Sequence, residues 1–321
     1  MPEIKHILLS IRDFIEILNP WILGLIIFFF GAIFGSFINV LIYRLPLEMD
    51  IVFKPSFCPN CKNPIKWYHN IPIFSYIFLG GKCAYCNKKI SISYLLVEVF
   101  TASSFVGFFI LFGISWDFFV LCFFFIITFP ILVIDFKYHI IPDELSIGGA
   151  ILGLILAVFN SFIGFQNNVN ISYGLNDSIF GALIGILIFG GIYFVSLIVF
   201  RKEGMGMGDV KFAATIGIFL GAPAATLSFF LSFLYGSLFG LIIVAIRRFK
   251  NRKKIKILYS VKNLNVSVDY LSSIVKNYVY LSNLDELRSS YVAFGPYMVL
   301  GAWTSIFFAS NIIENLIGGI I

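Results

Sequence analysis

Long apolar runs alternate with charged or polar stretches along almost the whole chain. A membrane-spanning helix needs about 20 consecutive apolar residues, and cutting the runs at charges, prolines and polar turns gives eight segments. The sixth is short for a full crossing, and we expect it to be tilted or to begin partly unwound, which is tolerated where the backbone lines a cavity. The predicted spans are residues 20–43, 94–113, 117–135, 145–164, 179–200, 211–222, 225–246 and 294–314.

The composition also indicates a membrane protein. Hydrophobic residues make up 59% of the 321 residues and charged residues 12%, whereas a soluble chain carries about 25% charged residues. We therefore predict an all-α polytopic membrane protein with about eight transmembrane helices. The first apolar run starts too late and is too long for a cleavable signal, so it is predicted to be retained. Residues 5–18 have roughly helical spacing and are expected to lie along the outer membrane surface.

The distribution of positive charge predicts the orientation. The loops 44–93, 136–144, 201–211 and 247–293 hold 21 of the 23 lysines and arginines, and the alternate connections hold none. By the positive-inside rule these four loops are cytoplasmic, and eight crossings satisfy the rule with strict alternation. The net charge of +6 then reflects topology and contact with lipid headgroups, and it does not indicate nucleic acid as a partner.

The end of the first span is predicted to pack against other helices. Gly35 and Ser36 are small enough to allow close helix contact, and Asn39 can hydrogen-bond within a bundle. Arg44 is expected to extend its charged end to the cytoplasmic face, and Pro46 to stop the helix.

Four of the five cysteines lie in the soluble loop that follows, in two CxxC pairs separated by 21 residues. Four thiolates can converge tetrahedrally on one ion, and cytoplasmic thiols stay reduced, so we predict a structural zinc site. A redox pair or unmetallated thiols are the alternative. His69 is not expected to be a ligand, and Lys62, Lys82, Lys88 and Lys89 would offset the charge of the site. The predicted ligands are Cys58, Cys61, Cys83 and Cys86.

Three acidic residues lie in or at the start of spans on the cytoplasmic side without an evident capping role: Glu98, Asp135 and Asp209. Such groups are costly in a membrane unless they are used. Glu98 is explained equally well by an interhelical hydrogen bond, whereas Asp143, by contrast, has a routine position as a helix N-cap.

Asp209 ends a glycine-rich turn, Glu203-Gly204-Met205-Gly206-Met207-Gly208-Asp209, which is followed by Val210 and Lys211. Alternate glycines leave φ free and allow a second chain to approach closely. A capped loop with a glycine hinge is the simpler interpretation of this turn alone. Two carboxylates brought close cannot both ionise cheaply, so one keeps a proton while the other acts on water, as in aspartic proteases.

The order of these motifs resembles the prepilin peptidases, or type IV leader peptidases, which are membrane aspartic proteases of the GxGD type. The matching motifs are GSFxNVxxxRLP at 35–46, the paired CxxC at 58–61 and 83–86, NIPxxSYxxLxGxC at 70–83, VE at 97–98, IDxxxxxIPD at 134–143, EGMGxGDxK at 203–211 and FGPY at 294–297.

The resemblance implies that Asp135 and Asp209 are the catalytic pair, and that the substrates are type IV prepilins or type II secretion pseudopilins, cut after a glycine. It implies a bacterial inner membrane as the location and, for many members, methylation of the new N-terminus with S-adenosylmethionine. Glu203, Gly204, Gly206, Gly208 and Lys211 would then form the active-site loop approached by substrate. Glu98 is a candidate for methyl transfer or for a structural polar contact.

The expected organisation has five parts. They are an N-terminal segment with the first span (1–43), a cytoplasmic zinc-binding loop domain (44–93), a peptidase core with both aspartates (94–246), a basic cytoplasmic insertion (247–293) and the last span (294–321). A transporter whose acids relay protons, or a zinc-stabilised assembly scaffold without proteolytic activity, is the alternative function. Clustering of the acids at one face, without a visible inverted repeat, disfavours the transporter.

Overall fold

The computed structural model describes residues 19–163, 174–201, 204–262 and 293–317, with only the backbone at 200, 243–262 and 309–317. Over these residues the chain is helical, and the only β structure is two isolated bridges in the loop after the first helix. The predicted all-α fold is therefore confirmed. The predictions for residues 5–18, for Glu203 and for 263–292 of the basic insertion lie outside the described residues.

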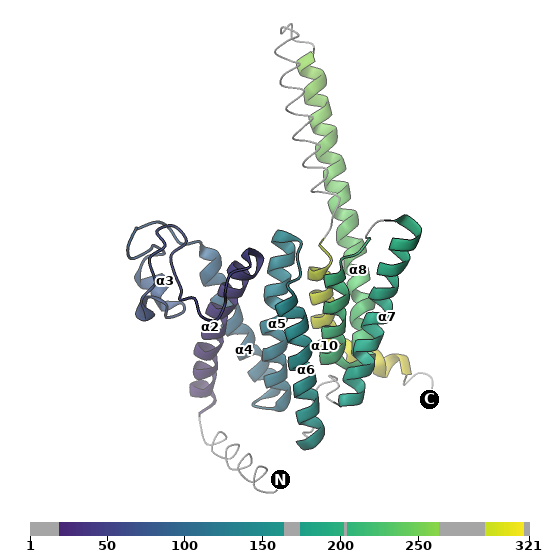
Figure 1. Ribbon diagram of the computed structural model, residues 1–321, viewed down its shortest axis with the longest axis horizontal. Coiled ribbons are helices and arrows are strands. Elements are labelled where there is room, and N and C mark those ends of the chain that lie inside the picture. The colour runs from purple at the N-terminus through teal and green to yellow at the C-terminus, as the bar shows by residue number, and fades with distance from the viewer. Residues whose placement is uncertain (1–18, 164–173, 202–203, 263–292, 318–321) are drawn as a thin grey trace. The chain divides into compact units, whose positions relative to one another are not determined.

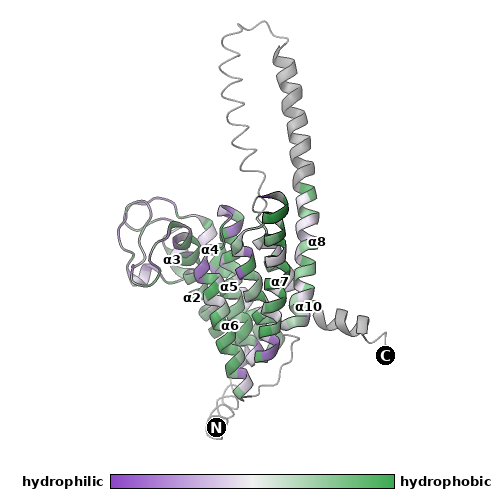
Figure 2. Ribbon diagram, turned by 45° about the vertical axis from the view of Figure 1, so that its right-hand side comes forward, coloured by the Kyte–Doolittle hydropathy of each residue, from purple (hydrophilic) through white to green (hydrophobic). Residues whose placement is uncertain are grey.

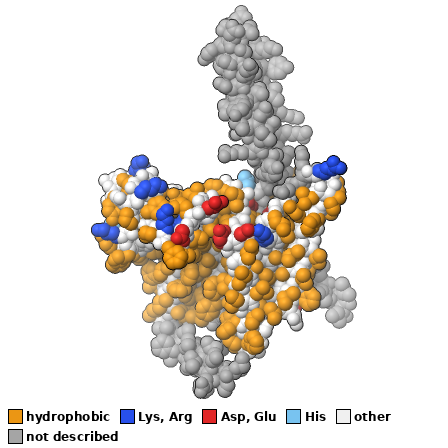
Figure 3. All heavy atoms as spheres, in the orientation of Figure 1, with side chains coloured by type: hydrophobic (Ala, Val, Ile, Leu, Met, Phe, Trp, Pro, Cys, Tyr) orange, Lys and Arg blue, Asp and Glu red, His pale blue; other side chains and the backbone are white. Residues whose placement is uncertain are grey.

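Six of the described helices are long and apolar enough to cross a membrane. Hydrophobic residues run along their length (Figure 2) and cover much of the face that Figure 3 shows. This agrees with a multi-pass membrane protein. The six are α2 (Pro20–Arg44), α4 (Ile92–Phe112), α5 (Trp116–Tyr138), α6 (Asp143–Ile163), α7 (Leu175–Phe200) and α8 (Met207–Lys262).

The described residues form two compact units, one up to Ile131 and one that contains nearly all of the chain from Leu132 onward. Helix α5 runs through the boundary between them. In the first unit α2 packs against α4, and the loop between these two helices carries the short helix α3 (Phe74–Phe78). In the second unit α7 and α10 (Gly295–Ile317) both pack on α8, as Figure 1 shows.

Helix α8 reverses direction at Gly221, where the backbone is not helical (φ 68°, ψ 176°). A Cβ at Gly185 of α7 would touch both Ala213, eight residues before the break, and Phe229, eight residues after it. Only a chain that doubles back brings both beside one residue. The two arms correspond to the predicted sixth and seventh spans, and with the arms counted separately and α10 added, the six helices become eight segments.

Glycines set the close contact between α2 and α4. A Cβ built on Gly31 would lie 2.8 Å from the Cα of Ala102, and one on Gly35 would lie 2.7 Å from the Cα of Glu98. Both distances are too short for any side chain, so the two backbones touch. Asn39 Nδ2 donates to the carbonyl of Tyr94 at 3.0 Å. The predicted packing role of this stretch is confirmed.

The prediction for Arg44 is wrong. Its side chain does not extend to solvent but is 4% exposed. Its guanidinium donates to the carbonyls of Asp50, Lys54 and Pro55 at 2.9, 2.8 and 3.0 Å. A buried guanidinium needs acceptors for its fork of donors, and the chain after Pro46 folds back to supply them. Arg44 thereby anchors the start of the loop that carries the cysteines.

Candidate active site and metal centre

The four predicted ligands come together in one cluster. The sulfur atoms of Cys58, Cys61, Cys83 and Cys86 all lie within 4.8 Å of one another, and those of Cys58 and Cys86 are 4.0 Å apart. Four sulfurs held about 2.3 Å from one zinc ion span distances of this order. The donor set therefore fits a closed, tetrahedral zinc site, and His69 is not part of it.

The two CxxC pairs have the same local geometry. In the first, Lys62 N donates to Cys58 O at 2.9 Å; in the second, Asn87 N donates to Cys83 O at 3.0 Å. Lys62 and Asn87 both have positive φ, at 60° and 57°. Each turn is closed by an isolated bridge, Phe57 with Pro64 and Lys82 with Lys89. This repeated turn aims backbone N–H groups at the sulfurs, an arrangement that favours thiolates.

The electrostatics of the cluster also favour a bound cation. The N–H groups of Cys86 and Tyr85 lower the pKa of the Cys83 thiol to about 7. At Cys61 a backbone hydrogen bond at Asn63 lowers the pKa, but desolvation and the three neighbouring thiols together raise it, to about 11. The thiols of the cluster therefore differ in how readily they ionise, and a bound cation would favour the thiolate form of all four.

Replacing Cys83 with serine is expected to remove bound zinc. Three thiolates and a hydroxyl hold zinc far less tightly than four thiolates, and structural zinc supplies about 10–16 kcal/mol to small zinc folds. Metal analysis of the purified protein should fall from about one zinc per chain to nearly none. The matched control is Cys122→Ala, because Cys122 lies in α5, outside the cluster. Full zinc in Cys83→Ser would contradict the site.

Asp135 lies near the end of α5 and is 5% exposed. Its Oδ2 accepts a hydrogen bond of 2.8 Å from the backbone N–H of Gly295, the first residue of α10. A helix N-terminus favours an anion, so this contact stabilises the carboxylate. A Cβ on Gly295 would lie only 2.6 Å from the same oxygen. Residue 295 must therefore lack a side chain for Asp135 to keep its position.

Asp209 lies in the first turn of α8 and is half-buried. Its Oδ2 accepts a hydrogen bond of 3.1 Å from the N–H of Gly206, the residue just before the helix. This contact agrees with the interpretation of the turn as a capped loop, with Asp209 capping the helix from its third residue. The carboxylate is also within electrostatic range of Asp135. The two predicted carboxylates are therefore brought together within the second unit.

The glycines of the turn serve close approach to the protein's own chain. Gly204 N donates to Ser196 Oγ of α7 at 3.1 Å, and a Cβ on Gly204 would lie 2.9 Å from Ser196 Cβ. A Cβ on Gly208 would lie 3.1 Å from Ile141. None of the three glycines has positive φ among the described residues. The close approach that glycine allows is made here by α7 and by Ile141, and approach of a substrate chain stays a prediction.

Lys211 contacts an acid from a distant part of the sequence. Its Nζ donates to both oxygens of Asp143, at 2.8 Å each. Helix α6 begins at Asp143 itself, so Asp143 is not the N-cap residue that was predicted. Its side chain forms an ion pair with Lys211 instead. Together with the contact between Gly208 and Ile141, the pair fastens the start of α8 to the segment before α6.

The turn of residues 294–297 opens the last span, and from the sequence we expect it to lie close to the cytoplasmic site. Nothing in the sequence indicates that Gly295 itself contacts a carboxylate 160 residues earlier. The neighbouring Phe294 packs on Phe189 and Phe233 of α7 and α8, with ring centroids 5.9 and 5.4 Å apart. This aromatic cluster fixes the start of α10. A glycine and a proline directly after a large aromatic, at the start of a span, are the available signal.

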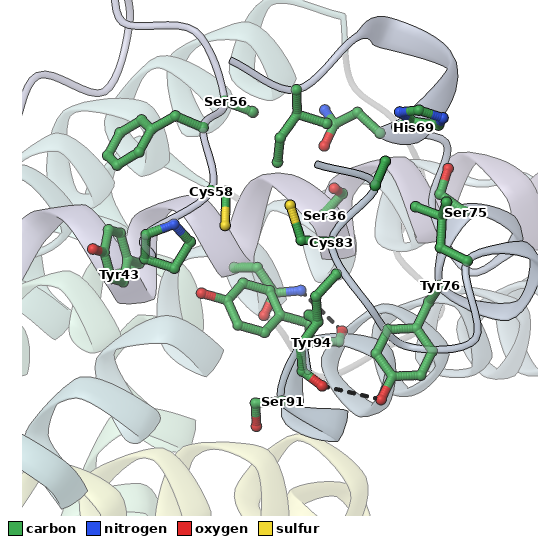
Figure 4. Close-up of a pocket in the computed structure, with 18 of the residues that line it drawn as sticks. Ser36, Tyr43, Ser56, Cys58, His69, Ser75, Tyr76, Cys83, Ser91 and Tyr94 are labelled. Atoms are coloured by element: carbon green, nitrogen blue, oxygen red, sulfur yellow. Dashed lines mark hydrogen bonds between the residues drawn. The ribbon is translucent and has the colours of Figure 1, made fainter. Parts of the chain in front are cut away.

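Glu98 lies at a pocket in the first unit. It is 9% exposed, and its Oε2 accepts a hydrogen bond of 2.7 Å from the N–H of Ile73 in the loop. The pocket has a volume of about 320 Å³ and lies between α2, α4 and the cysteine loop (Figure 4). Its polar lining includes Asn39, Asn70 and His69. The Nδ1 atom of His69 is buried and has no hydrogen-bond partner among the described residues.

Comparison with known proteins covers both units. Residues 29–112 match the model of the Bacterial Peptidase A24 N-terminal domain, and residues 118–241 match the Type IV leader peptidase family. The chain is 37% identical over 213 residues to the prepilin leader peptidase/N-methyltransferase of Vibrio cholerae, covering 63% of this chain and 79% of that protein. It is 32% identical over 245 residues to the Pseudomonas aeruginosa protein of that name, covering 68% and 79%.

A third similar protein is the prepilin leader peptidase/N-methyltransferase of Aeromonas hydrophila. It is 29% identical over 260 residues, covering 74% of this chain and 86% of that protein. No solved structure gives a significant match. The two matched segments contain both predicted aspartates and all four clustered cysteines.

Proposed function

The chain belongs to the type IV leader peptidase family, and we propose that Asp135 and Asp209 are the carboxylates with which this prepilin peptidase cuts its substrates. Its apolar helices and its family make it a multi-pass protein of the bacterial inner membrane. The substrates are the prepilins and pseudopilins of type IV pili and type II secretion, cut after the glycine that ends a basic leader.

The observation that carries this proposal is the arrangement of the two carboxylates. Each has one oxygen fixed by a backbone N–H, that of Gly295 for Asp135 and that of Gly206 for Asp209. The other oxygen of each, Oδ1, accepts no hydrogen bond from the residues that the structure describes. Each aspartate thus keeps one oxygen for positioning and presents the other to water or substrate.

The pair supplies an acid and a base. The two negative charges repel each other in a partly buried site, so they share one proton. The ionised carboxylate removes a proton from a water molecule, which attacks the carbonyl carbon of the glycine that precedes the scissile bond. The protonated carboxyl donates its proton to the leaving amide nitrogen. Each positioned group contributes roughly 10²–10⁴-fold to the rate.

The charge distribution supports a cytoplasmic position for the site. The loops that hold the cysteines, Asp143 and the glycine turn carry 11 of the chain's 23 lysines and arginines, and residues 247–293 carry ten more. Such basic loops stay on the cytoplasmic side. A substrate would lie with its basic leader in the cytoplasm and its apolar segment in the bilayer. Its scissile bond would then reach the level of the two aspartates, which lie at span ends.

The pocket beside Glu98 supports a second activity, transfer of a methyl group to the new N-terminus. A volume of about 320 Å³ is at the lower end of small-molecule sites. S-adenosylmethionine, when bound, would supply a methyl group on a positively charged sulfur. The Glu98 carboxylate would favour that charge, and the polar side chains of Asn39, Asn70 and His69 could bind polar atoms.

The peptidase proposal is tested with the purified full-length protein in detergent and a substrate made of a basic leader, a glycine and an apolar helix. Mass spectrometry should show loss of the leader alone without S-adenosylmethionine. With it, the product should also gain the mass of one methyl group. An intact substrate, from protein shown to be folded and zinc-loaded, would favour the transporter or scaffold alternatives.

Glu98→Gln is expected to reduce methylation while leaving cleavage within about twofold. Glutamine keeps an oxygen that can accept the Ile73 N–H, so the loop stays attached, but it removes the negative charge that would favour a sulfonium. The measurement is the ratio of methylated to cleaved product over time. The control is Ser93→Ala, which alters an exposed residue of the same helix and should leave methylation unchanged. Unchanged methylation in Glu98→Gln would exclude a role for the charge.

A further inference from the structure

The loop between the two CxxC pairs contains a stretch without a single charged residue, Asn70–Gly81 (NIPIFSYIFLGG). It includes α3. Two of its large apolar side chains are strongly exposed, Ile77 at 63% and Phe78 at 84%. Lysines flank the stretch at 66 and 82. An exposed apolar surface of this kind is unusual in a loop that lies in water, and it indicates contact with an apolar partner.

Contact with α2 shows how far along the membrane helix this stretch reaches. The ring of Phe74 stacks on that of Phe29, with centroids 5.7 Å apart. Phe29 precedes Arg44, the last residue of α2, by fifteen residues, which is about 22 Å along the helix axis. The hydrocarbon core of a bilayer is about 30 Å thick. Phe74 therefore lies beside a part of α2 that is inside the apolar region.

The stretch also continues the outward apolar face of α2. Phe29, Ile33 and Phe37 of α2 are 40%, 57% and 44% exposed. These three side chains line one open groove of about 600 Å³ together with Ile71, Pro72 and Phe74 of the loop. The exposed side of a membrane-spanning helix faces acyl chains. A loop surface that continues this face of α2 therefore contacts acyl chains as well.

Most of the backbone N–H groups in this stretch have a partner within the protein. A polar backbone group left without a partner in hydrocarbon costs several kcal/mol. Glu98 Oε2 accepts the N–H of Ile73 at 2.7 Å, and carbonyls of the protein accept six further N–H groups of the stretch. These are the N–H groups of Phe74, Ser75, Ile77, Leu79, Gly80 and Gly81.

The side-chain hydroxyls follow the same rule. Ser75 Oγ donates to Tyr68 O at 3.1 Å and Tyr76 Oη donates to Ile90 O at 3.3 Å. Ile73 has φ 64°, a costly conformation for a β-branched residue. The bond to Glu98 holds it there.

We propose that Asn70–Gly81 is embedded among the acyl chains of the bilayer beside α2, with Ile77 and Phe78 facing lipid. The stretch is then a membrane-inserted part of the cysteine loop, which was predicted to be soluble. Lys66 and Lys82 mark its two ends at the level of the headgroups, where their charge suits anionic lipid. Glu98, a costly acid inside α4, gains a structural reason for its position, because it satisfies the backbone where the chain enters the bilayer.

Photo-crosslinking of the full-length protein in nanodiscs tests this placement. Phe78 is replaced by p-benzoylphenylalanine, the sample is irradiated, and intact mass spectrometry detects the added mass of one phospholipid. Phe30 of α2, 57% exposed, carries the same probe as the membrane reference. Tyr85 is the matched control, because it is an aromatic residue of the same loop with 42% exposure but lies between two zinc ligands. Zinc content shows that each variant is folded.

The expected result is a lipid adduct at Phe78 in a yield similar to that at Phe30, and none at Tyr85. Absence of a lipid adduct at Phe78, while Phe30 gives one, would overturn the proposal. A Phe78 adduct to a second copy of the chain would also overturn it, because the apolar face would then be a protein interface. An adduct to added prepilin that replaces the lipid adduct would assign the face to substrate instead.

Discussion

Asp209→Asn is expected to lower the rate of leader cleavage by roughly 10²–10⁴-fold, and Asp135→Asn by a similar factor. Asparagine keeps an oxygen that can accept the N–H of Gly206 or Gly295, so the local fold is retained. It can neither hold nor release the shared proton. The measurement is the initial rate of leader release, followed by mass spectrometry, for each variant at equal zinc content.

The double variant separates a catalytic pair from two independent contributions. Two carboxylates that share one proton act as a unit, so removing the second should cost little once the first is gone. The loss in Asp135→Asn/Asp209→Asn should therefore be close to that of either single variant. Losses that multiply would indicate that the two residues act separately.

An acidic residue remote from the pair provides the control. Asp177 is exposed in the first turn of α7, nineteen residues before Ser196, which contacts the glycine turn. Asp177→Asn removes the same charge at a point about 28 Å along α7 from Ser196, and it should leave the cleavage rate unchanged. Parent-level cleavage by both active-site variants would exclude the carboxylate mechanism and favour a different role for the turn.

Features that depend on local sequence could be predicted. Apolar runs gave the spans because each must satisfy its own backbone in lipid. The CxxC spacing gave the metal cluster because each pair forms the same short turn, at Cys58–Lys62 and at Cys83–Asn87. The short sixth span was also recognised, and the break at Gly221 explains it.

Features that depend on distant parts of the chain could not be predicted. The burial of Arg44 follows from where residues 50–55 fold, and the bond between Ile73 and Glu98 joins positions 25 residues apart. Apolar periodicity carries no signal for either contact. The glycine turn has the same limit: alternate glycines predict freedom in φ and close approach of another chain, but they do not indicate that Ser196 and Ile141 are the residues approached. Sequence alone does not distinguish these two uses of glycine.

Gly295→Ala is expected to reduce kcat for leader cleavage by roughly 10²-fold with little change in KM. The new Cβ would lie 2.6 Å from Asp135 Oδ2, where an ordinary contact is at least 3.4 Å. The carboxylate must then shift by nearly an ångström, and a misplacement of about 1 Å at a reacting group costs on the order of 10²-fold. KM should stay unchanged, because Gly295 contacts Asp135 and we propose no contact between Gly295 and the substrate.

Gly148→Ala is the matched control for this substitution. Gly148 lies in α6, and a Cβ there meets nothing within 4 Å. Alanine in a helix is more favourable than glycine by roughly 0.5–1 kcal/mol, so this variant should be as active as the parent and slightly more stable. A rise in KM with unchanged kcat in Gly295→Ala would instead place the glycine against substrate. At 2.6 Å from Asp135 Oδ2 the new Cβ must displace the carboxylate. A cleavage rate equal to that of the parent would therefore mean that the N–H of Gly295 does not position Asp135 for catalysis.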